Sequence, residues 1–153
     1  MAHIHEKIDF TTSVYIVCEG KVLLHKHKKL GIWLPPGGHI ELDEDPTIAA
    51  VREAKEESGF DITLVGNPTL DVSLQDDSKD LTPPMFINRH HINDTHEHVD
   101  FIYFGLVVGG DLNPEDGVAM KWVSKEEIQS NNSEIREGVR LYALAALKYF
   151  ESK

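Results

Sequence analysis

The sequence predicts a mixed α/β fold of the α+β kind. One observation is that segments with alternating, β-branched residues outnumber segments with helical periodicity. A second is their order, which contains too few alternating strand–helix units for a doubly wound parallel sheet. The third is size and composition: 153 residues, 41% of them hydrophobic and 27% charged, fit one ordinary globular domain over residues 1–153.

The chain begins with a predicted β-hairpin. Residues 11–18 alternate and are rich in β-branched side chains, as expected for a strand. Glu19 and Gly20 form a turn signal, and residues 21–26 are the expected return strand. We expect no regular structure around Pro35-Pro36-Gly37-Gly38, because proline fixes φ and lacks an amide hydrogen.

A helix with two marked ends follows this segment. Asp45 can cap its N-terminus, and Pro46 suits the first helical position. Gly59 is placed to end the helix in the left-handed conformation. This leaves about three turns at roughly 3.6 residues per turn. The apolar face of the helix, which we expect to pack on a sheet, consists of Ile48, Val51 and Ala54.

The remaining elements complete the mixed order. Five further strands are predicted over residues 61–65, 69–74, 85–92, 98–108 and 119–123, with loops at 75–84 and 109–117. Ser124 and Glu127 match a capping box at the start of a short helix. Ser133 is the expected cap of the last helix, and its apolar stripe consists of Ile135, Val139, Tyr142, Ala146 and Phe150.

Charge and composition narrow the function classes. The formal net charge of −11 argues against general affinity for nucleic acid or for an anionic membrane surface. No apolar window approaches the length of a membrane span, and the N-terminus lacks the features of a signal peptide. Cys18 is the only cysteine, so no internal disulfide can form. We therefore expect a cytoplasmic protein.

Acidic residues are concentrated in and before the marked helix. Between Gly38 and Phe60 the chain carries seven acidic residues and two basic ones. Glu53, Glu56 and Glu57 fall on one face of the helix, where like charges cost roughly 0.2–0.5 kcal/mol per pair. A hard divalent cation such as Mg²⁺ or Mn²⁺ would neutralise such oxygen ligands. Taken alone, however, a carboxylate-rich helix is more often a solvated acidic face than a metal site.

The spacing around these acids resembles the Nudix box, G-x5-E-x7-R-E-U-x-E-E-x-G-U, in which U is a bulky apolar residue. Ala54 stands where a larger aliphatic residue is usual, which removes no ligand. Every charged and glycine position is matched, by Gly38, Glu44, Arg52, Glu53, Glu56, Glu57 and Gly59, and Phe60 completes the pattern.

The resemblance to the Nudix hydrolases extends beyond the box, to residues 33–38 before it and residues 120–127 near the end of the domain. It implies an α/β/α sandwich with a mixed β-sheet between helices. It also implies a chemistry: attack by water on a phosphorus of a nucleoside diphosphate linked to another moiety. The implied enzyme is a metal-dependent pyrophosphohydrolase.

The family pattern carries roles onto individual residues. It implies Mg²⁺ as cofactor, with Mn²⁺ as a substitute. Arg52 joins the three helix glutamates as a catalytic residue, and it can pair with Glu56 four residues on and with Glu44, which supports the loop. The implied metal ligands are the Gly38 backbone carbonyl, Glu53, Glu56 and Glu57.

The general base and any further ligand lie partly outside the pattern. Glu53 is one candidate for the base, and family members differ in using an acid outside the box. Glu97, Glu115 and Asp116 lie in segments that can reach the site. We expect Asp116 or Glu115 as the extra metal ligand.

Histidines form a second group of interest. His96, His98 and Asp100 alternate, so they share a face of the predicted strand. Together with His90 and His91 they allow a metal site or contact with a substrate's base or phosphate. Ordinary solvent-exposed strand residues are the alternative.

The expected partner is a small nucleotide-type molecule, with neither nucleic acid nor membrane, and a homodimer is an open possibility. The basic run His25–Lys29 either receives phosphates or is a solvated hairpin end. A second function class is a non-catalytic Nudix-like binding module, although such modules typically lack the box carboxylates. Diphosphate isomerisation is disfavoured, because Cys18 lies outside any motif that would make it catalytic. The motif predicts the reaction, and loops outside it select the substrate.

Overall fold

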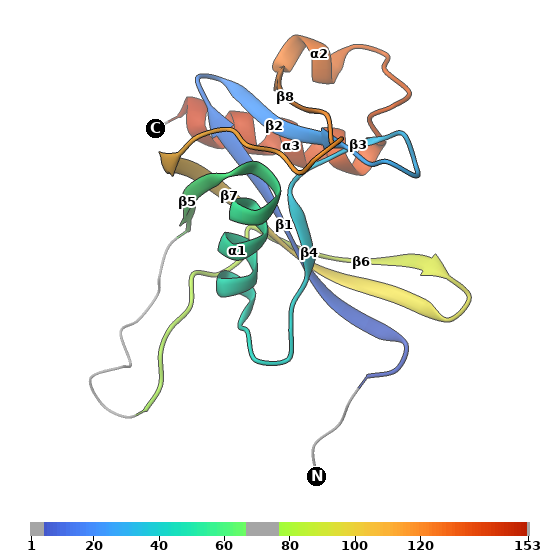
Figure 1. The fold of residues 1–153 in the computed structure, drawn as a ribbon, viewed down its shortest axis with the longest axis vertical. Helices are drawn as coiled ribbons and strands as arrows, with labels where there is room; N and C mark the ends of the chain where they lie inside the picture. The colour runs from blue at the N-terminus through green and yellow to red at the C-terminus, as the bar shows by residue number, and fades with distance from the viewer. Residues whose placement is uncertain (1–4, 67–76, 153) are drawn as a thin grey trace.

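The computed structural model describes residues 5–66 and 77–152. They form a mixed β-sheet with α1 (Pro46–Ser58) on one face and with α2 (Lys125–Gln129) and α3 (Glu137–Glu151) on the other, as Figure 1 shows. This α/β/α sandwich confirms the predicted fold class. No helix in the described ranges is both long and apolar enough to cross a membrane.

The sheet is mixed because one of its pairings is parallel. Its strand order is β3-β2-β1-β7-β5, with β4 paired to β1, β6 to β7 and β8 to β2. The β1–β7 pair is parallel and the others are antiparallel. The strands are β1 (Ile8–Cys18), β2 (Lys21–Lys26), β3 (Trp33–Leu34), β4 (Gly37–His39), β5 (Phe60–Val65), β6 (Phe86–Asn93), β7 (His96–Gly110) and β8 (Met120–Ser124).

Two apolar clusters hold the layers together, and neighbouring residues of β1 and β7 alternate between them. The cluster beneath α1 contains Val14, Ile16, Leu23, Ala50, Ala54, Phe60, Ile62 and Tyr103. The cluster beneath α2 and α3 includes Tyr15, Val17, Val22, Leu24, Ile102, Phe104, Ile128, Ala143, Ala146 and Leu147. The central strands are therefore buried on both faces, which fixes their register relative to the helices.

Helix α1 has the predicted ends but a different buried face. Asp45 Oδ1 accepts hydrogen bonds from the amides of Thr47 at 2.8 Å and of Ile48 at 2.9 Å, and Gly59 has φ +86°. The expectation that Ile48 and Val51 pack on the sheet is wrong, since they are 53% and 39% exposed. Small side chains let this helix lie close to the sheet, and the buried face consists of Ala49, Ala50, Ala54 and Ser58.

The segment before α1 is more regular than predicted. Gly37–His39 pairs antiparallel with β1, and Trp33–Leu34 pairs with β2. Proline does not prevent this, because Pro36 contributes an acceptor: its carbonyl receives the Val14 amide at 2.9 Å. The other strand predictions agree within a few residues, and the strand expected over 69–74 lies outside the described residues.

The start of the last helix also differs from the prediction. Helix α3 begins at Glu137 after Arg136, and no side chain caps it, so Ser133 is not its cap. Instead the Arg140 guanidinium donates hydrogen bonds to backbone carbonyls in the last turn of α2 and between α2 and α3, which holds that connection in a non-helical path. These carbonyls belong to Ile128, Ser130, Asn132 and Ile135.

Candidate active site

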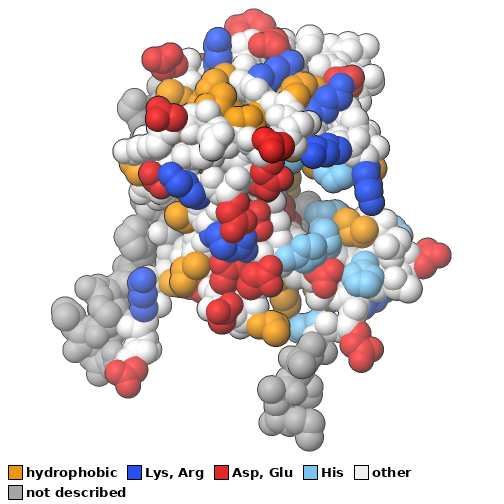
Figure 2. Space-filling view, viewed as in Figure 1, with side chains coloured by type: hydrophobic (Ala, Val, Ile, Leu, Met, Phe, Trp, Pro, Cys, Tyr) orange, Lys and Arg blue, Asp and Glu red, His pale blue; other side chains and the backbone are white. Residues whose placement is uncertain are grey.

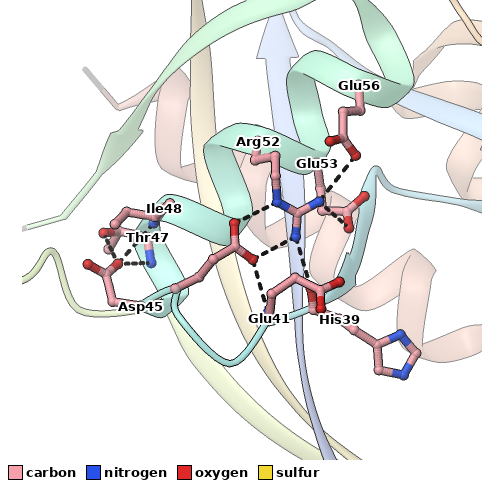
Figure 3. A network of polar contacts seen from close by, with 9 residues as sticks. His39, Glu41, Asp45, Thr47, Ile48, Arg52, Glu53 and Glu56 are labelled. Atoms are coloured by element: carbon pink, nitrogen blue, oxygen red, sulfur yellow. Dashed lines mark hydrogen bonds and ion pairs between the residues drawn. The ribbon is translucent and has the colours of Figure 1, made fainter.

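Arg52 organises the acidic face of α1 (Figure 3). Its Nε and Nη2 donate to the two carboxylate oxygens of Glu44 at 2.6 and 2.8 Å. Its Nη1 donates to Glu53 at 2.9 Å and to Glu56 at 3.1 Å, so the expected ion pair with Glu56 is present. The second bond from Nη2 goes to the His39 carbonyl at 3.1 Å. One guanidinium therefore connects the helix to the segment that enters it.

Glu44 and Arg52 hold each other in the ionised form. The hydrogen bonds from Arg52 lower the pKa of Glu44 to about 2, with a further contribution from the backbone amide of Glu41. The hydrogen bonds to Glu44 and Glu53 raise the pKa of Arg52. Glu44 thus orients Arg52, and Arg52 in turn orients Glu53 and Glu56.

Glu57, like Glu53, lies deeper than Glu56. Its Oε1 accepts the Gly37 amide at 3.1 Å, and its Oε2 lies 3.2 Å from Nε2 of His25. Its side chain is 17% exposed, against 56% for Glu56. Burial, with the negative charges of Glu53 and Glu115 also contributing, raises the pKa of Glu57 to about 8.

Gly38 is required by the close approach of β4 to the helix. A Cβ built on Gly38 would lie 2.4 Å from Oε1 of Glu53, well inside van der Waals contact. Its backbone therefore lies directly against the Glu53 carboxylate. Two half-buried carboxylates, Glu53 and Glu57, face this backbone with Glu56 beside them, and such a group is costly unless a cation neutralises it. The donors are all oxygens, so they fit Mg²⁺ or Mn²⁺.

The comparison with known families agrees with this geometry. The sequence model of the NUDIX domain family matches residues 9–142 of this chain. The chain belongs to the Nudix hydrolase family.

Individual Nudix proteins resemble the chain to different extents. The crystal structure of a NUDIX-family hydrolase from Clostridium perfringens superposes with a TM-score of 0.80 at 38% identity, covering 96% of this chain and 99% of that one. A Lactococcus lactis protein named probable DHNTP pyrophosphohydrolase is 31% identical over 65% of this chain and 55% of its own length. A putative 8-oxo-dGTP diphosphatase from Bacillus subtilis is 27% identical over 68% of this chain and 58% of its own. The chain thus spans little more than half of these two curated relatives.

A cavity of about 550 Å³ opens beside the Nudix box. Its wall includes Gly37 and Gly38, so it reaches the backbone that faces the box carboxylates. Asp100 also lines it and is buried, accepting hydrogen bonds from Thr11 at 3.0 Å and Ser13 at 2.7 Å. Burial raises the pKa of Asp100. The volume is within the range of small-molecule sites.

A second cavity, of about 400 Å³, reaches Glu57 and shares His25 and His27 with the first. The basic run His25–Lys29 lines it together with Glu57 and Glu115. Of Glu97, Glu115 and Asp116, Glu115 is the one that lines this cavity together with a glutamate of the box. The backbone carbonyl of Asp116 accepts a hydrogen bond from Lys28 at 3.0 Å, and Glu97 is paired with Arg89 on the sheet.

Three contacts of the site are not predictable from the Nudix box. His25 touches Glu57, the Gly37 amide binds the same carboxylate, and Asp100 lies on the cavity wall. The available signal was alternation along strands, which puts His25 and Asp100 on definite faces but does not say which strands are neighbours.

Proposed function

We propose that this protein is a Mg²⁺-dependent pyrophosphohydrolase that cleaves a nucleoside diphosphate linked to another moiety. The observation that carries the proposal is the complete carboxylate set of the Nudix box, held by Arg52 and including the half-buried Glu57. A binding module would gain nothing from burying a carboxylate whose pKa is raised to about 8. Burying an ionised carboxylate costs free energy, and a cation bound beside it would offset that cost.

The chain's own residues have distinct tasks in this reaction. Glu53, Glu56 and Glu57 would hold the cation with the Gly38 carbonyl, while Arg52 fixes the direction of the Glu53 and Glu56 carboxylates. Bound Mg²⁺ would supply charge neutralisation for the diphosphate and a lowered pKa for water. A water oxygen forms the new bond to phosphorus, the bridging P–O bond breaks, and the water's proton passes to a carboxylate base. Glu53 is our candidate for that base.

The substrate we propose is a small nucleotide-type molecule. The cavity of about 550 Å³ has room for a nucleoside moiety, with Asp100 as an acceptor on its wall. Phosphates extending toward Glu57 would meet the basic run of the second cavity. The named relatives direct attention to DHNTP and 8-oxo-dGTP as the first compounds to test.

The test is product analysis with Mg²⁺ over a substrate panel: DHNTP, 8-oxo-dGTP, nucleoside triphosphates, nucleotide sugars, ADP-ribose and dinucleoside polyphosphates. Chelation should abolish turnover and added Mg²⁺ should restore it. Glu57→Gln should lower kcat/KM by at least about 100-fold. Mutating a residue that only hydrogen-bonds to a metal ligand typically costs about 10–100-fold in metal affinity or activity, and loss of a ligand itself should cost more. The matched control is Glu126→Gln, an exposed glutamate on α2 outside the site.

Two results would overturn the proposal. Turnover unaffected by Glu57→Gln would remove the box from the reaction. Tight binding of a nucleotide without turnover, at saturating Mg²⁺, would identify the chain as a binding module.

A further inference from the structure

Three imidazoles surround one carboxylate at the start of β1. The Nε2 atoms of His39, His96 and His98 lie 3.7, 3.8 and 4.0 Å from the same oxygen of Asp9, Oδ2. For Asp9, His39 and His98, one ligand atom of each lies within 4.8 Å of the others. Figure 2 shows histidine side chains gathered beside the acidic patch on one face of the molecule.

Sheet register explains how residues distant in sequence meet here. Asp9 is directly opposite His98 in the parallel β1–β7 pair, so their side chains leave the same face. His39 on β4 pairs with Thr11, two residues from Asp9, and therefore lies on that face too. His96 is two residues before His98 on β7. Asp9 occupies the middle strand, with imidazoles on both sides.

The sequence pattern alone groups the wrong acid with these histidines. Asp100 alternates with His96 and His98, yet its carboxylate accepts hydrogen bonds from Thr11 and Ser13 and is buried. Asp9, nearly ninety residues away in the sequence, takes the position next to the imidazoles.

We propose that Asp9, His39 and His98, with His96 as a fourth ligand, form a binding site for a transition-metal dication of the Zn²⁺ class. Imidazole nitrogens with one carboxylate are ligands that Zn²⁺, Co²⁺ and Ni²⁺ prefer, whereas Mg²⁺ prefers oxygens only. Zinc–ligand distances of about 2.0–2.1 Å correspond to ligand atoms roughly 3.4 Å apart in a tetrahedron. The three imidazoles lie 3.7–4.0 Å from Asp9 Oδ2, a few tenths of an ångström beyond this spacing. The ligand atoms of Asp9, His39 and His98 lie within 4.8 Å of one another, and His96, which is outside that group, has to move further to join them.

The ligands are held in place by strands of the sheet, and they are also partly exposed to solvent. Three come from β1 and β7, and the fourth, His39, ends β4. The side chains of Asp9, His98 and His39 are 33%, 22% and 59% exposed, so an ion can enter without unfolding. The His90 ring packs edge-on against His98 at 5.3 Å between centroids and limits its rotation.

This site lies outside the Nudix box but adjoins it, and His39 and His98 also line the cavity of about 550 Å³. His39 directly follows Gly38, and its carbonyl accepts the Arg52 bond. An ion bound to the His39 ring would therefore fasten the end of β4, which carries the Gly38 carbonyl. The site requires only these imidazoles and one carboxylate, so it would exist whether or not the box hydrolyses a nucleotide.

The experiment uses the full-length protein after treatment with a chelator, in buffer with excess Mg²⁺ to occupy the box. Zn²⁺ titration by calorimetry should show one tight equivalent, and Co²⁺ should give the intense visible absorption of a four-coordinate ion. Asp9→Asn combined with His98→Gln should weaken Zn²⁺ binding by at least about 100-fold and remove the Co²⁺ spectrum. His39→Gln provides a second, independent variant if the double variant folds poorly.

Two controls separate this site from others. His91→Gln removes a neighbouring imidazole that does not belong to the proposed site. His91 is the register partner of Glu97 on β7, whereas His98 is the register partner of His90, so Zn²⁺ binding should be unchanged in this variant. Glu57→Gln should also leave it unchanged, because the box is not involved. No Zn²⁺ binding at all, unchanged binding in the Asp9 and His98 variant, or loss of binding in Glu57→Gln would each overturn the proposal.

Discussion

The Arg52 guanidinium binds both carboxylate oxygens of Glu44, at 2.6 and 2.8 Å. Glu44 belongs to the loop before α1, and Arg52 belongs to the helix, so this bidentate pair sets the distance between them. The remaining donors of Arg52 are then directed at Glu53, Glu56 and the His39 carbonyl. A planar group with a fixed fork of donors can do this, whereas an ammonium cannot.

Replacing Arg52 by lysine should therefore impair the site although the charge is kept. We expect Arg52→Lys to lower kcat/KM by about 10–100-fold and to raise the Mg²⁺ concentration needed for half-maximal activity. Steady-state kinetics over a Mg²⁺ series measures both. The matched control is Arg89→Lys on β6, where the arginine pairs with Glu97 away from the box. If Arg52→Lys shows the parent's Mg²⁺ dependence, Arg52 does not position the ligands.

The two glycines of β4 should respond differently to an added methyl group. A Cβ on Gly37 would lie 2.2 Å from the backbone oxygen of Thr12 and 3.0 Å from the Cα of Ser13, which cannot move without breaking the β1–β4 pairing. A Cβ on Gly38 would meet the Glu53 carboxylate, the far end of a side chain that can rotate.

We therefore expect Gly37→Ala to destabilise the fold by about 1–3 kcal/mol, the usual cost of overpacking. Gly38→Ala should change stability less and activity more, because Glu53 must leave its place. Denaturant unfolding and kcat/KM of the two variants, compared side by side, test this contrast. Equal losses of stability with equal activities would contradict it.

The sequence predicted the box helix well because its signals are local. The Asp45 cap, Pro46 and Gly59 lie within the element that they delimit, and the structure has all three in those roles. Local signals failed where a distant partner decides the outcome. Ser133 looked like a cap, but Arg140 holds the preceding segment through its carbonyls.

Contacts between strands were the other limit of prediction. Alternation places Asp9 and His98 on definite faces, but only the parallel β1–β7 register brings them opposite each other. Likewise, nothing local links His25 of β2 with Glu57 of α1. Pairing of strands depends on the whole chain, so neither the place of Asp9 and His39 beside His96 and His98 nor the surroundings of Glu57 can be predicted from the pattern alone.

Cation binding should release a proton from Glu57. Because the pKa of Glu57 is raised to about 8, the carboxyl is mostly protonated at pH 7 when no cation is present. A cation binds the ionised form, so its affinity rises with pH up to about 8 and levels off above it. Below pH 8 the expected slope is at most about tenfold per pH unit.

Calorimetry of Mg²⁺ binding at pH 7, in buffers of different ionisation enthalpy, measures the number of protons released. We expect about one proton for the parent and markedly less for Glu57→Gln, which has no carboxyl to ionise. Glu126→Gln on α2 should match the parent. Mg²⁺ affinity that is independent of pH between 6 and 8 would show that Glu57 is already ionised.

The choice between Glu115 and Asp116 as the extra ligand can be made with two matched amide variants. Glu115 lines the same cavity as Glu57, and its negative charge contributes to the raised pKa of Glu57. For Asp116, the contact in the structure is made by the backbone carbonyl, which receives Lys28 and is unaffected by a side-chain change. A carboxylate that faces the box acids repels them when no cation is bound and binds the cation with them when one is present.

We therefore expect Glu115→Gln to weaken Mg²⁺ binding by several-fold. It should also lower the pKa of Glu57, which would be detected as a smaller proton release. Asp116→Asn should leave both the Mg²⁺ affinity and the proton release unchanged. The reverse ranking would assign the ligand to Asp116.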